Sequence, residues 1–354
     1  MILCIFLYRN VAAVTLPTNG TTPAVFAFGD STLDTGNNDY IISGLKSNFP
    51  PYGRDFMGGM PTGRFSNGRV PSNLIGSGYD PLTAELQSVL SLSDQLDLFK
   101  EYKSKINTAV GNEKTATLLS KILFIISMGS NDLAFSYFAT PLMSAHYDIP
   151  AYTDFLLEFA STFFQKLYAL GARVIGVASM PPIGCVPAQR TLGGGIERAC
   201  SEAENQAAML YNSKLSALVD SLNKRLPEAL VIYIDIYNPF LSIIQDPAQY
   251  GFEVVDKGCC GTGIVEFGLL CNKHTPGTCN DASKFVSAYI TSTTTIGTLI
   301  LISFLADEGV GVKKILPAYM DPNLQLQDLL TGVCFASAGS GYDPLTPKLQ
   351  YQIN

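Results

Sequence analysis

Short apolar runs recur along the chain, and between them apolar residues return at every third or fourth position. The runs are typical of strands buried on both faces, and the spacing is typical of amphipathic helices. The runs predict strands at 24–29, 121–127, 173–178 and 230–235. The spacing predicts helices at 92–110, 152–170 and 196–226, the second of which Gly171 closes as a C-cap. Strands that alternate with helices indicate an α/β fold with a parallel sheet.

Two of the predicted strands end in a glycine that small polar residues follow. Gly29-Asp30-Ser31-Thr32 follows the first strand, and Gly129-Ser130-Asn131-Asp132 follows the second. The carboxyl ends of parallel strands share one edge of the sheet, and ligands collect at that edge. Ser31 and Asn131 are therefore candidates for one site. The turn and cap residues after Ser31 suit the start of a helix, so a capping serine without chemistry is the alternative.

Further motifs decide between these readings. The chain contains Pro-Pro-Tyr-Gly-Arg-Asp-Phe at 50–56, Pro-Thr-Gly-Arg-Phe-Ser-Asn-Gly-Arg at 61–69 and Pro-Pro-Ile-Gly-Cys-Val-Pro at 181–187. With the two turns above, they resemble the plant-type GDSL esterase/lipase family of the SGNH hydrolase superfamily, over residues 23–286. The resemblance implies a three-layer α/β/α, flavodoxin-like fold with a parallel sheet. Position 33 is leucine, so the G-x-S-x-G elbow of the α/β-hydrolases is absent.

The resemblance also implies an activity, the hydrolysis of carboxylic or lipid esters through an acyl-serine, without a cofactor. Ser31 falls on the family's nucleophile. The oxyanion donors would be the N–H of Ser31, the side chain of Asn131 and a glycine N–H that falls on Gly76 or on Gly339. Glycine suits that role because its backbone can approach a substrate closely. Ordinary turn residues at 76 and 131 are the alternatives.

The family's base, the histidine of an Asp-x-x-His motif, has no counterpart in this chain. Its two histidines, His146 and His274, lie in polar segments that predict solvated loops. Asp281 matches a non-catalytic aspartate of the family. A serine hydrolase without its base loses about 10⁴–10⁶ in turnover. The sequence therefore predicts an ester hydrolase with a damaged catalytic apparatus, and a non-catalytic or vestigial ligand-binding relative is the alternative.

An internal repeat stands out, because Gly-Ser-Gly-Tyr-Asp-Pro-Leu-Thr occurs at 76–83 and again at 339–346. In the family a segment with the second strand precedes this motif, and here such a segment precedes only the later copy. The second strand is therefore missing from its usual place, and Gly332 to Ser337 has the matching sequence. The tail is predicted to pair with the exposed edge of the 24–29 strand, and a tail that hangs free is the alternative.

These features divide the chain into four parts. Residues 1–20 resemble a truncated secretory signal, and residues 21–286 form the hydrolase domain, with an internal deletion after residue 75. Residues 287–306 are an uncharged linker or spurious insert, and residues 307–354 are the partial second copy. Secretion is the predicted localisation. A membrane helix over 285–306 is the alternative, but its many threonines favour a linker.

The net charge and the cysteine content indicate which binding partners and which cellular compartment are compatible with the chain. The net charge is −7 and the chain has no dense basic patch, which argues against nucleic acid. Eight cysteines, together with a glycosylation triplet at Asn19, suit an oxidising compartment. The Cys/His spacing matches no zinc pattern, so disulfides are predicted rather than a metal site. The cysteines from Cys185 to Cys279 are expected to pair among themselves, and Cys334 is expected to stay free.

Overall fold

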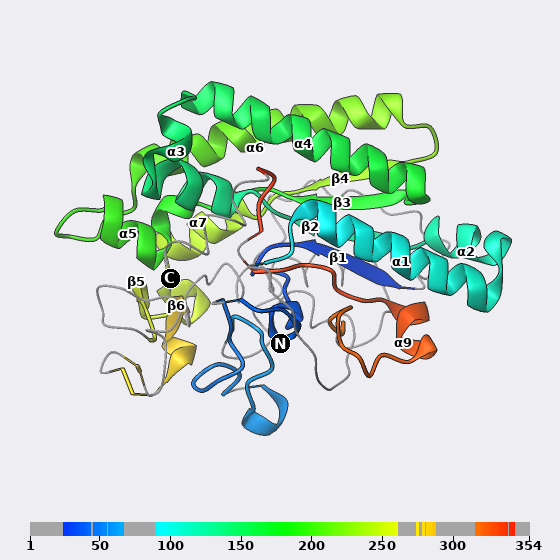
Figure 1. Cartoon of the computed structure of the whole chain (residues 1–354). Helices are drawn as coiled ribbons and strands as arrows, with labels where there is room; N and C mark the ends of the chain where they lie inside the picture. Colours follow the sequence, from blue (N-terminus) through cyan, green and yellow to red (C-terminus); the bar gives the residue numbers. More distant parts are fainter. Residues whose placement is uncertain are drawn as a thin grey trace.

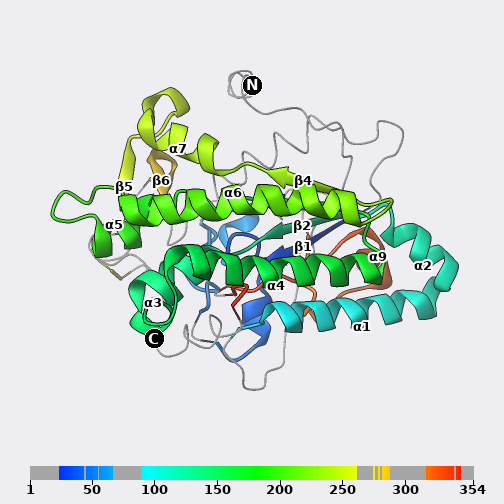
Figure 2. The same cartoon turned by 90° about the horizontal axis from the view of Figure 1, so that it is seen from above.

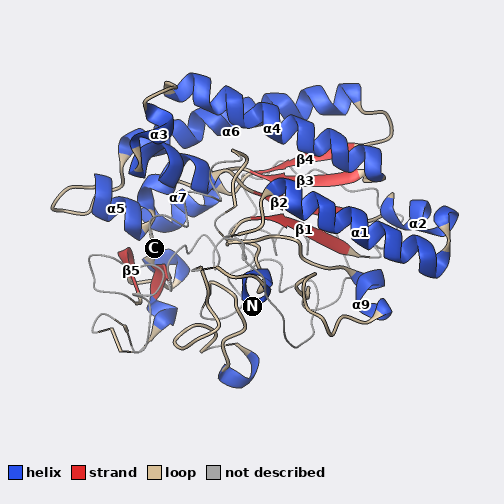
Figure 3. Ribbon diagram, viewed as in Figure 1, coloured by secondary structure: helices blue, strands red, loops and turns tan. Residues whose placement is uncertain are grey.

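A four-stranded parallel sheet forms the centre of the protein. The computed structural model describes residues 24–43, 45–54, 56–66, 89–260, 274–275, 278–279, 281–287, 316–338 and 340–343. The strands are β1 (Val25–Gly29), β2 (Leu123–Ser127), β3 (Val174–Ala178) and β4 (Leu230–Ile234), and they lie in this order across the sheet. Figure 3 shows them in the middle of the molecule. All four predicted strands are confirmed.

Helices connect the strands and cover the sheet. They are α1 (Leu92–Val110), α2 (Asn112–Leu119), α3 (Pro141–Ser144), α4 (Ile149–Leu170), α5 (Pro187–Gly193), α6 (Glu202–Arg225), α7 (Tyr237–Gln245) and α9 (Leu326–Thr331), with a π-helix at Asp132–Ala139. Figure 2 shows α1, α4 and α6 side by side across one face of the sheet. Among the described residues, no helix combines the length and the apolarity that a membrane crossing needs.

The side chains of β1 alternate between the two faces of the sheet, as successive residues of a strand do. Phe26 and Phe28 pack in the large cluster under α1, α4 and α6. Val25 and Ala27 pack in a second cluster with residues of α7. Both faces of the sheet are therefore buried, which accounts for the continuous apolar character of the strands. This arrangement confirms the predicted α/β/α class.

The predicted helix boundaries hold for α1 and fail for α6. Ser91 and Asp94 form a capping box at the start of α1, which spans the predicted range of 92–110. The expectation of a helix from residue 196 is wrong, because α6 begins at Glu202. Cys200 is joined to Cys185 by a disulfide. In addition, the N–H of Ser201 donates to the carbonyl oxygen of Gly184 at 2.9 Å. These links hold the chain in a loop up to the start of α6.

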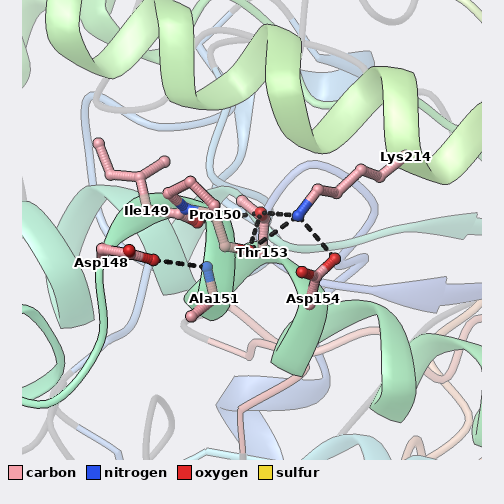
Figure 4. Close-up of polar contacts among 7 residues, drawn as sticks. All are labelled: Asp148, Ile149, Pro150, Ala151, Thr153, Asp154 and Lys214. Atoms are coloured by element: carbon pink, nitrogen blue, oxygen red, sulfur yellow. Dashed lines mark hydrogen bonds and ion pairs between the residues drawn. The ribbon is translucent and has the colours of Figure 1, made fainter.

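A polar cluster joins α6 to the first turn of α4 (Figure 4). Asp148 caps α4, since its side chain accepts a hydrogen bond from the N–H of Ala151 at 2.8 Å. The ammonium group of Lys214 donates to the carbonyl oxygen of Pro150 at 2.8 Å and lies 2.6 Å from the exposed carboxylate of Asp154. An exposed ion pair contributes little by itself. The cluster therefore serves mainly to fix the start of α4 against α6.

The disulfides follow the predicted division of the cysteines. Cys185 pairs with Cys200, Cys259 pairs with Cys279, and Cys260 is also disulfide-bonded. Cys334 is free and buried. The second disulfide lies beside a small two-stranded sheet of β5 (Val254–Gly258) and β6 (Phe285–Ser287). The prediction that Cys334 stays free while the others pair is confirmed for the described cysteines.

The tail takes the strand position beside β1. Cys334 forms a parallel bridge with Ala27, and on its other side it bridges to Ala318. The N–H of Phe335 donates to the carbonyl oxygen of Ala27 at 2.8 Å, and the N–H of Ser337 donates to that of Gly29 at 2.9 Å. Figure 1 shows the orange and red tail running along β1. The predicted pairing is thus confirmed, and a free tail is wrong.

Candidate active site

Ser31 and Asn131 come from neighbouring strand ends. Ser31 follows β1 and Asn131 follows β2, and the register pairs Gly29 with Ser127, the last residues of the two strands. The N–H of Asp30 continues this pairing by donating to the carbonyl oxygen of Ser127 at 3.2 Å. Both candidate side chains are almost buried, at 7% exposed each. The structure therefore brings the two predicted residues to one edge of the sheet.

A tight turn presents Ser31 at this edge. The Asp30 carboxylate accepts hydrogen bonds from the N–H of Thr32 at 2.9 Å and from its hydroxyl at 2.8 Å. Burial raises the pKa of Asp30 to about 6, although these bonds oppose the rise. Gly29 has a φ of +150°, and a Cβ there would lie 2.0 Å from the carbonyl oxygen of Ser127. Only glycine fits at the point where β1 enters the turn.

The loop after β2 holds the tail. The side-chain amide of Asn131 donates to the carbonyl oxygen of Ser340 at 2.7 Å. The buried carboxylate of Asp132 accepts from the N–H of Tyr342 at 2.7 Å. Gly341 passes so close to Asp132 that a Cβ would lie 2.1 Å from its carboxylate oxygen. The glycine of the Gly-Ser-Gly-Tyr repeat thus allows the tail to reach the end of β2.

The first turn of α4 also contacts the part of the tail that Asn131 and Asp132 bind. Asp132 accepts a second hydrogen bond from the N–H of Asp343 at 3.1 Å, and the Tyr152 hydroxyl donates to the Asp343 carboxylate at 2.9 Å. Residues 340–343 belong to the second copy of the repeat, so this copy occupies the site. The two predicted oxyanion glycines, Gly76 and Gly339, lie outside the described residues. Asn19, the predicted glycosylation residue, also lies outside them.

Asparagine side chains after Ser31 bind the outer part of the tail strand. Asn37 donates to the carbonyl oxygens of Cys334 at 3.0 Å and Ala336 at 2.8 Å. Asn38 donates to that of Ala338 at 3.1 Å. Amide side chains can pair with an edge strand much as a neighbouring strand does. The segment that carries Ser31 is therefore also the segment that holds the tail.

A buried carboxylate lies in the same segment. Asp34 is fully buried and accepts hydrogen bonds from the N–H groups of Gly36 at 2.8 Å, Asn37 at 2.8 Å and Ala338 at 3.3 Å. Burial raises the pKa of Asp34 to about 7, against the opposing effect of these bonds. The folded state therefore favours the protonated acid more than the unfolded state does.

Because of Asp34, we expect the protein to be more stable near pH 6 than near pH 8. The pKa of an aspartate in an unfolded chain is about 3.9. With a folded-state pKa of about 7, the stabilisation is complete below about pH 4 and is lost as the pH rises through about 7. Between about pH 8 and pH 6 this amounts to roughly 1.4 kcal/mol. Urea unfolding at several pH values measures it.

The variant Asp34→Asn tests the assignment, since it should remove the part of this pH dependence that Asp34 contributes. Burial also raises the pKa of Glu204 to about 7, so a second part of similar size should remain in the variant. Asp30→Asn is the comparison, because the pKa of Asp30, raised by burial to about 6, predicts a smaller contribution at lower pH. A native protein that becomes more stable from about pH 6 to pH 8 would contradict the expectation, as would an Asp34→Asn profile that matches the native one.

The histidines and Asp281 lie where the sequence led us to expect them. His146 and His274 are both exposed; His146 lies in the turn after α3, and His274 precedes Cys279 by five residues. The Asp281 side chain accepts from the N–H of Ser283 at 3.0 Å and caps a short 3-10 helix at Ala282–Lys284. Within the described residues, no group of histidine, cysteine and acidic side chains could hold a metal ion.

Residues 25–275 match the family model of the GDSL-like lipase/acylhydrolases. The chain belongs to this family. It is 49% identical over 298 residues to GDSL esterase/lipase At3g14820 of Arabidopsis thaliana, an alignment that covers 75% of this chain and 84% of the relative. It is 45% identical over 314 residues to GDSL esterase/lipase EXL3 of the same plant, with 80% and 86% covered. These matches confirm the resemblance to the GDSL family that the sequence motifs indicated.

In this GDSL protein the sequence motifs led to Ser31 and Asn131 but missed Gln95. Gln95 is fully buried and hydrogen-bonds both to Gly29 and to Ser340. Its position gave a signal, because it falls on the same face of α1 as the apolar residues Leu92 and Phe99. A polar side chain in an apolar stripe must find partners when it is buried, and it therefore marks a specific contact.

Proposed function

We propose that this chain is a carboxylic ester hydrolase with Ser31 as its nucleophile and without a cofactor. The oxygen of Ser31 forms a bond to the carbonyl carbon of the ester, and the alcohol leaves after it takes up a proton. Water then releases the acid from the acyl-serine. The position of Ser31 at the carboxyl end of β1 supports this role, because ligands of parallel α/β sheets bind at that edge. The substrates are small-molecule or lipid esters.

Asn131 and Gly339 are the proposed oxyanion donors, together with the N–H of Ser31. The observation that carries this proposal is the hydrogen bond of 2.7 Å from Asn131 to the carbonyl oxygen of Ser340. It favours Gly339 over Gly76, because Gly339 immediately precedes Ser340. A primary amide has two N–H groups, enough to hold the tail and to donate to an oxyanion.

The chain lacks the Asp-x-x-His motif, so in our proposal the proton of Ser31 passes to solvent and turnover is slow. This absence favours the second candidate function, a non-catalytic relative that binds esters without hydrolysing them. We further propose that the protein is secreted and carries a glycan at Asn19. The disulfides Cys185–Cys200 and Cys259–Cys279 support an oxidising compartment.

The variant Ser31→Cys separates the two candidates, because a thiolate attacks an ester without a histidine base. All these variants also carry Cys4→Ser, so that Cys4, which lies outside the group from Cys185 to Cys279, does not react with the ester. In Ser31→Cys, p-nitrophenyl acetate should then release one equivalent of p-nitrophenolate and leave an acetyl group at position 31. Replacing Asn131 by leucine in this background should slow the release by about 10²–10³, the usual cost of one oxyanion donor. Peptide mass mapping locates the acetyl group.

The controls are Ser31→Ala, which should release no such equivalent, and Asn131→Asp, which keeps the size of the side chain. An acetyl group at another residue, or an unchanged rate in both Asn131 variants, would overturn the hydrolase proposal. Binding of the ester without any acylation would favour the non-catalytic relative.

A further inference from the structure

Gln95 is the polar residue of an otherwise apolar helix face. The buried residues of α1 are Leu92, Gln95, Leu96, Phe99, Tyr102 and Ile106. The exposed fraction of Gln95 is 0%. Burying a primary amide costs free energy unless its hydrogen bonds are replaced. A leucine or methionine at this position would fill the same volume without that cost, so the amide is explained by its partners.

The Gln95 amide pairs with both backbone groups of Gly29. Its oxygen accepts from the N–H of Gly29 at 2.9 Å, and its nitrogen donates to the carbonyl oxygen of Gly29 at 2.9 Å. Gly29 is the last residue of β1 and lies two positions before Ser31. Two hydrogen bonds to one residue fix the orientation of its peptide groups. The direction in which the chain leaves β1 toward Ser31 is therefore set from α1.

The same amide also reaches the tail. Its nitrogen lies 3.2 Å from the hydroxyl oxygen of Ser340. That hydroxyl donates in turn to the carbonyl oxygen of Leu90, just before α1. The carbonyl oxygen of Ser340 is the group that Asn131 holds. Gln95 thus connects the backbone before Ser31 to the residue that Asn131 binds, although these segments lie far apart in the sequence.

The helix that carries Gln95 is firmly held. Phe99 and Tyr102, one and two turns further along α1, pack against the ring of Phe26 at centroid distances of 5.8 and 4.8 Å. Tyr102 also donates to the carbonyl oxygen of Leu329 in the tail at 3.0 Å. A side chain on a helix anchored in this way can position its partners precisely.

We propose that Gln95 is a positioning residue, which aligns the nucleophile at Ser31 with the oxyanion donors by holding Gly29 and Ser340 together. The inference rests on the proposed function, since it assigns Gln95 to the acylation of position 31. Gln95 does not touch the substrate. Loss of its amide should leave the fold assembled, but should misplace the reacting groups by up to about 1 Å.

Gln95→Met is the test variant, because it keeps the volume and removes the hydrogen bonds to Gly29 and Ser340 together with a long one, of 3.5 Å, to the carbonyl oxygen of Leu90. Gln189→Met is the matched control. Gln189, on α5, is also a buried glutamine, 3% exposed. Its amide donates to the carbonyl oxygen of Ala134 at 3.0 Å, and no hydrogen bond joins it to Gly29 or Ser340 among the described residues. Thermal unfolding of both variants measures the general cost of losing a buried amide, so that the remaining effect is specific to position 95.

In the Ser31→Cys background, Gln95→Met should slow acylation by p-nitrophenyl acetate by about 10–100-fold, the scale of a misplacement of about 1 Å. Gln189→Met should stay within about twofold, since the hydrogen bond that it removes goes to Ala134 and to none of Gly29, Ser340 and Asn131. Gln95→Glu restores one acceptor for Gly29 but loses the amide donors, so it should not rescue the rate. Equal rates in the two methionine variants would overturn the proposal, because the role of Gln95 would then be only structural.

A second measurement uses the native Ser31 with Cys4→Ser and follows the reaction of Cys334 with a thiol reagent. If Gln95 joins the tail to β1, Cys334 should react about tenfold faster in Gln95→Met than in Gln189→Met, when each variant is measured at the same number of degrees below its own Tm. If the thiol at position 31 is acylated in none of the variants, the proposed function is rejected. The Cys334 rates would still decide whether Gln95 couples the two segments, and equal rates would reject that coupling.

Discussion

Removal of residues 288–354 is expected to convert the protein into a species that aggregates and unfolds at a much lower temperature. Without the tail, β1 loses the partner of its edge, which now bonds Phe335 and Ser337. An unpaired strand edge is a template for association with other chains. The deletion also uncovers Phe26 and Phe28, whose rings lie 5.9 and 4.8 Å from that of Phe335. Light scattering and thermal unfolding of the truncated chain measure both effects.

Point variants separate this packing from the general consequences of a large deletion. Phe335 is fully buried, and Phe335→Ala should cost about 3–5 kcal/mol of unfolding free energy, the range for a buried phenylalanine. Leu326 is 47% exposed in the same tail, and Leu326→Ala should cost under about 0.5 kcal/mol. A truncated chain as soluble and as stable as the full one would show that the tail does not complete the sheet.

The strands and α1 could be predicted because their pattern comes from burial alone. Residues 24–29 are apolar throughout because β1 is covered on both faces and on both edges. The position of the tail beside β1 was predicted from the duplicated motif together with the family resemblance, because in the family a second strand precedes that motif. The strands themselves needed only hydrophobicity and spacing, which suffice where packing decides the structure.

The features that the sequence analysis missed depend on contacts between distant residues. The start of α6 is set by the Cys185–Cys200 disulfide and not by the periodicity, which extends back to residue 196. Asn37 and Asn38 looked like residues that start a helix. They do begin a single 3-10 turn at Asn37–Tyr40, but their amides bind the tail about 300 residues away. The partner of a polar side chain cannot be found from its local pattern.

The residues of the candidate site likewise fall into those that could be predicted from the sequence and those that could not. Ser31 and Asn131 could be predicted, because each follows a strand and carries a family motif. Gln95 has no motif and appears only as an irregularity in the apolar face of α1. Its partners, Gly29 and Ser340, come from opposite ends of the chain. The supporting contacts of the site were therefore accessible only from the structure.

The native chain is expected to hydrolyse p-nitrophenyl acetate at a rate barely above that of the solution. Ser31 has no Asp-x-x-His to take its proton, and loss of the base lowers turnover by about 10⁴–10⁶, with only oxyanion and binding effects left. Steady-state release of p-nitrophenolate measures the rate, and Ser31→Ala gives the background. The structure strengthens the expectation, because both histidines lie exposed in loops while Ser31 is almost buried.

Added imidazole provides the positive control for this expectation. If the site is intact and only the base is missing, imidazole should raise the rate of the native chain above that of Ser31→Ala, since it supplies a general base from solution. Asn131→Leu should lower this rescued rate. A high rate without imidazole that Ser31→Ala abolishes would contradict the expectation, because another group would then serve as the base. His146→Ala and His274→Ala would show which histidine it is, if either one loses the activity.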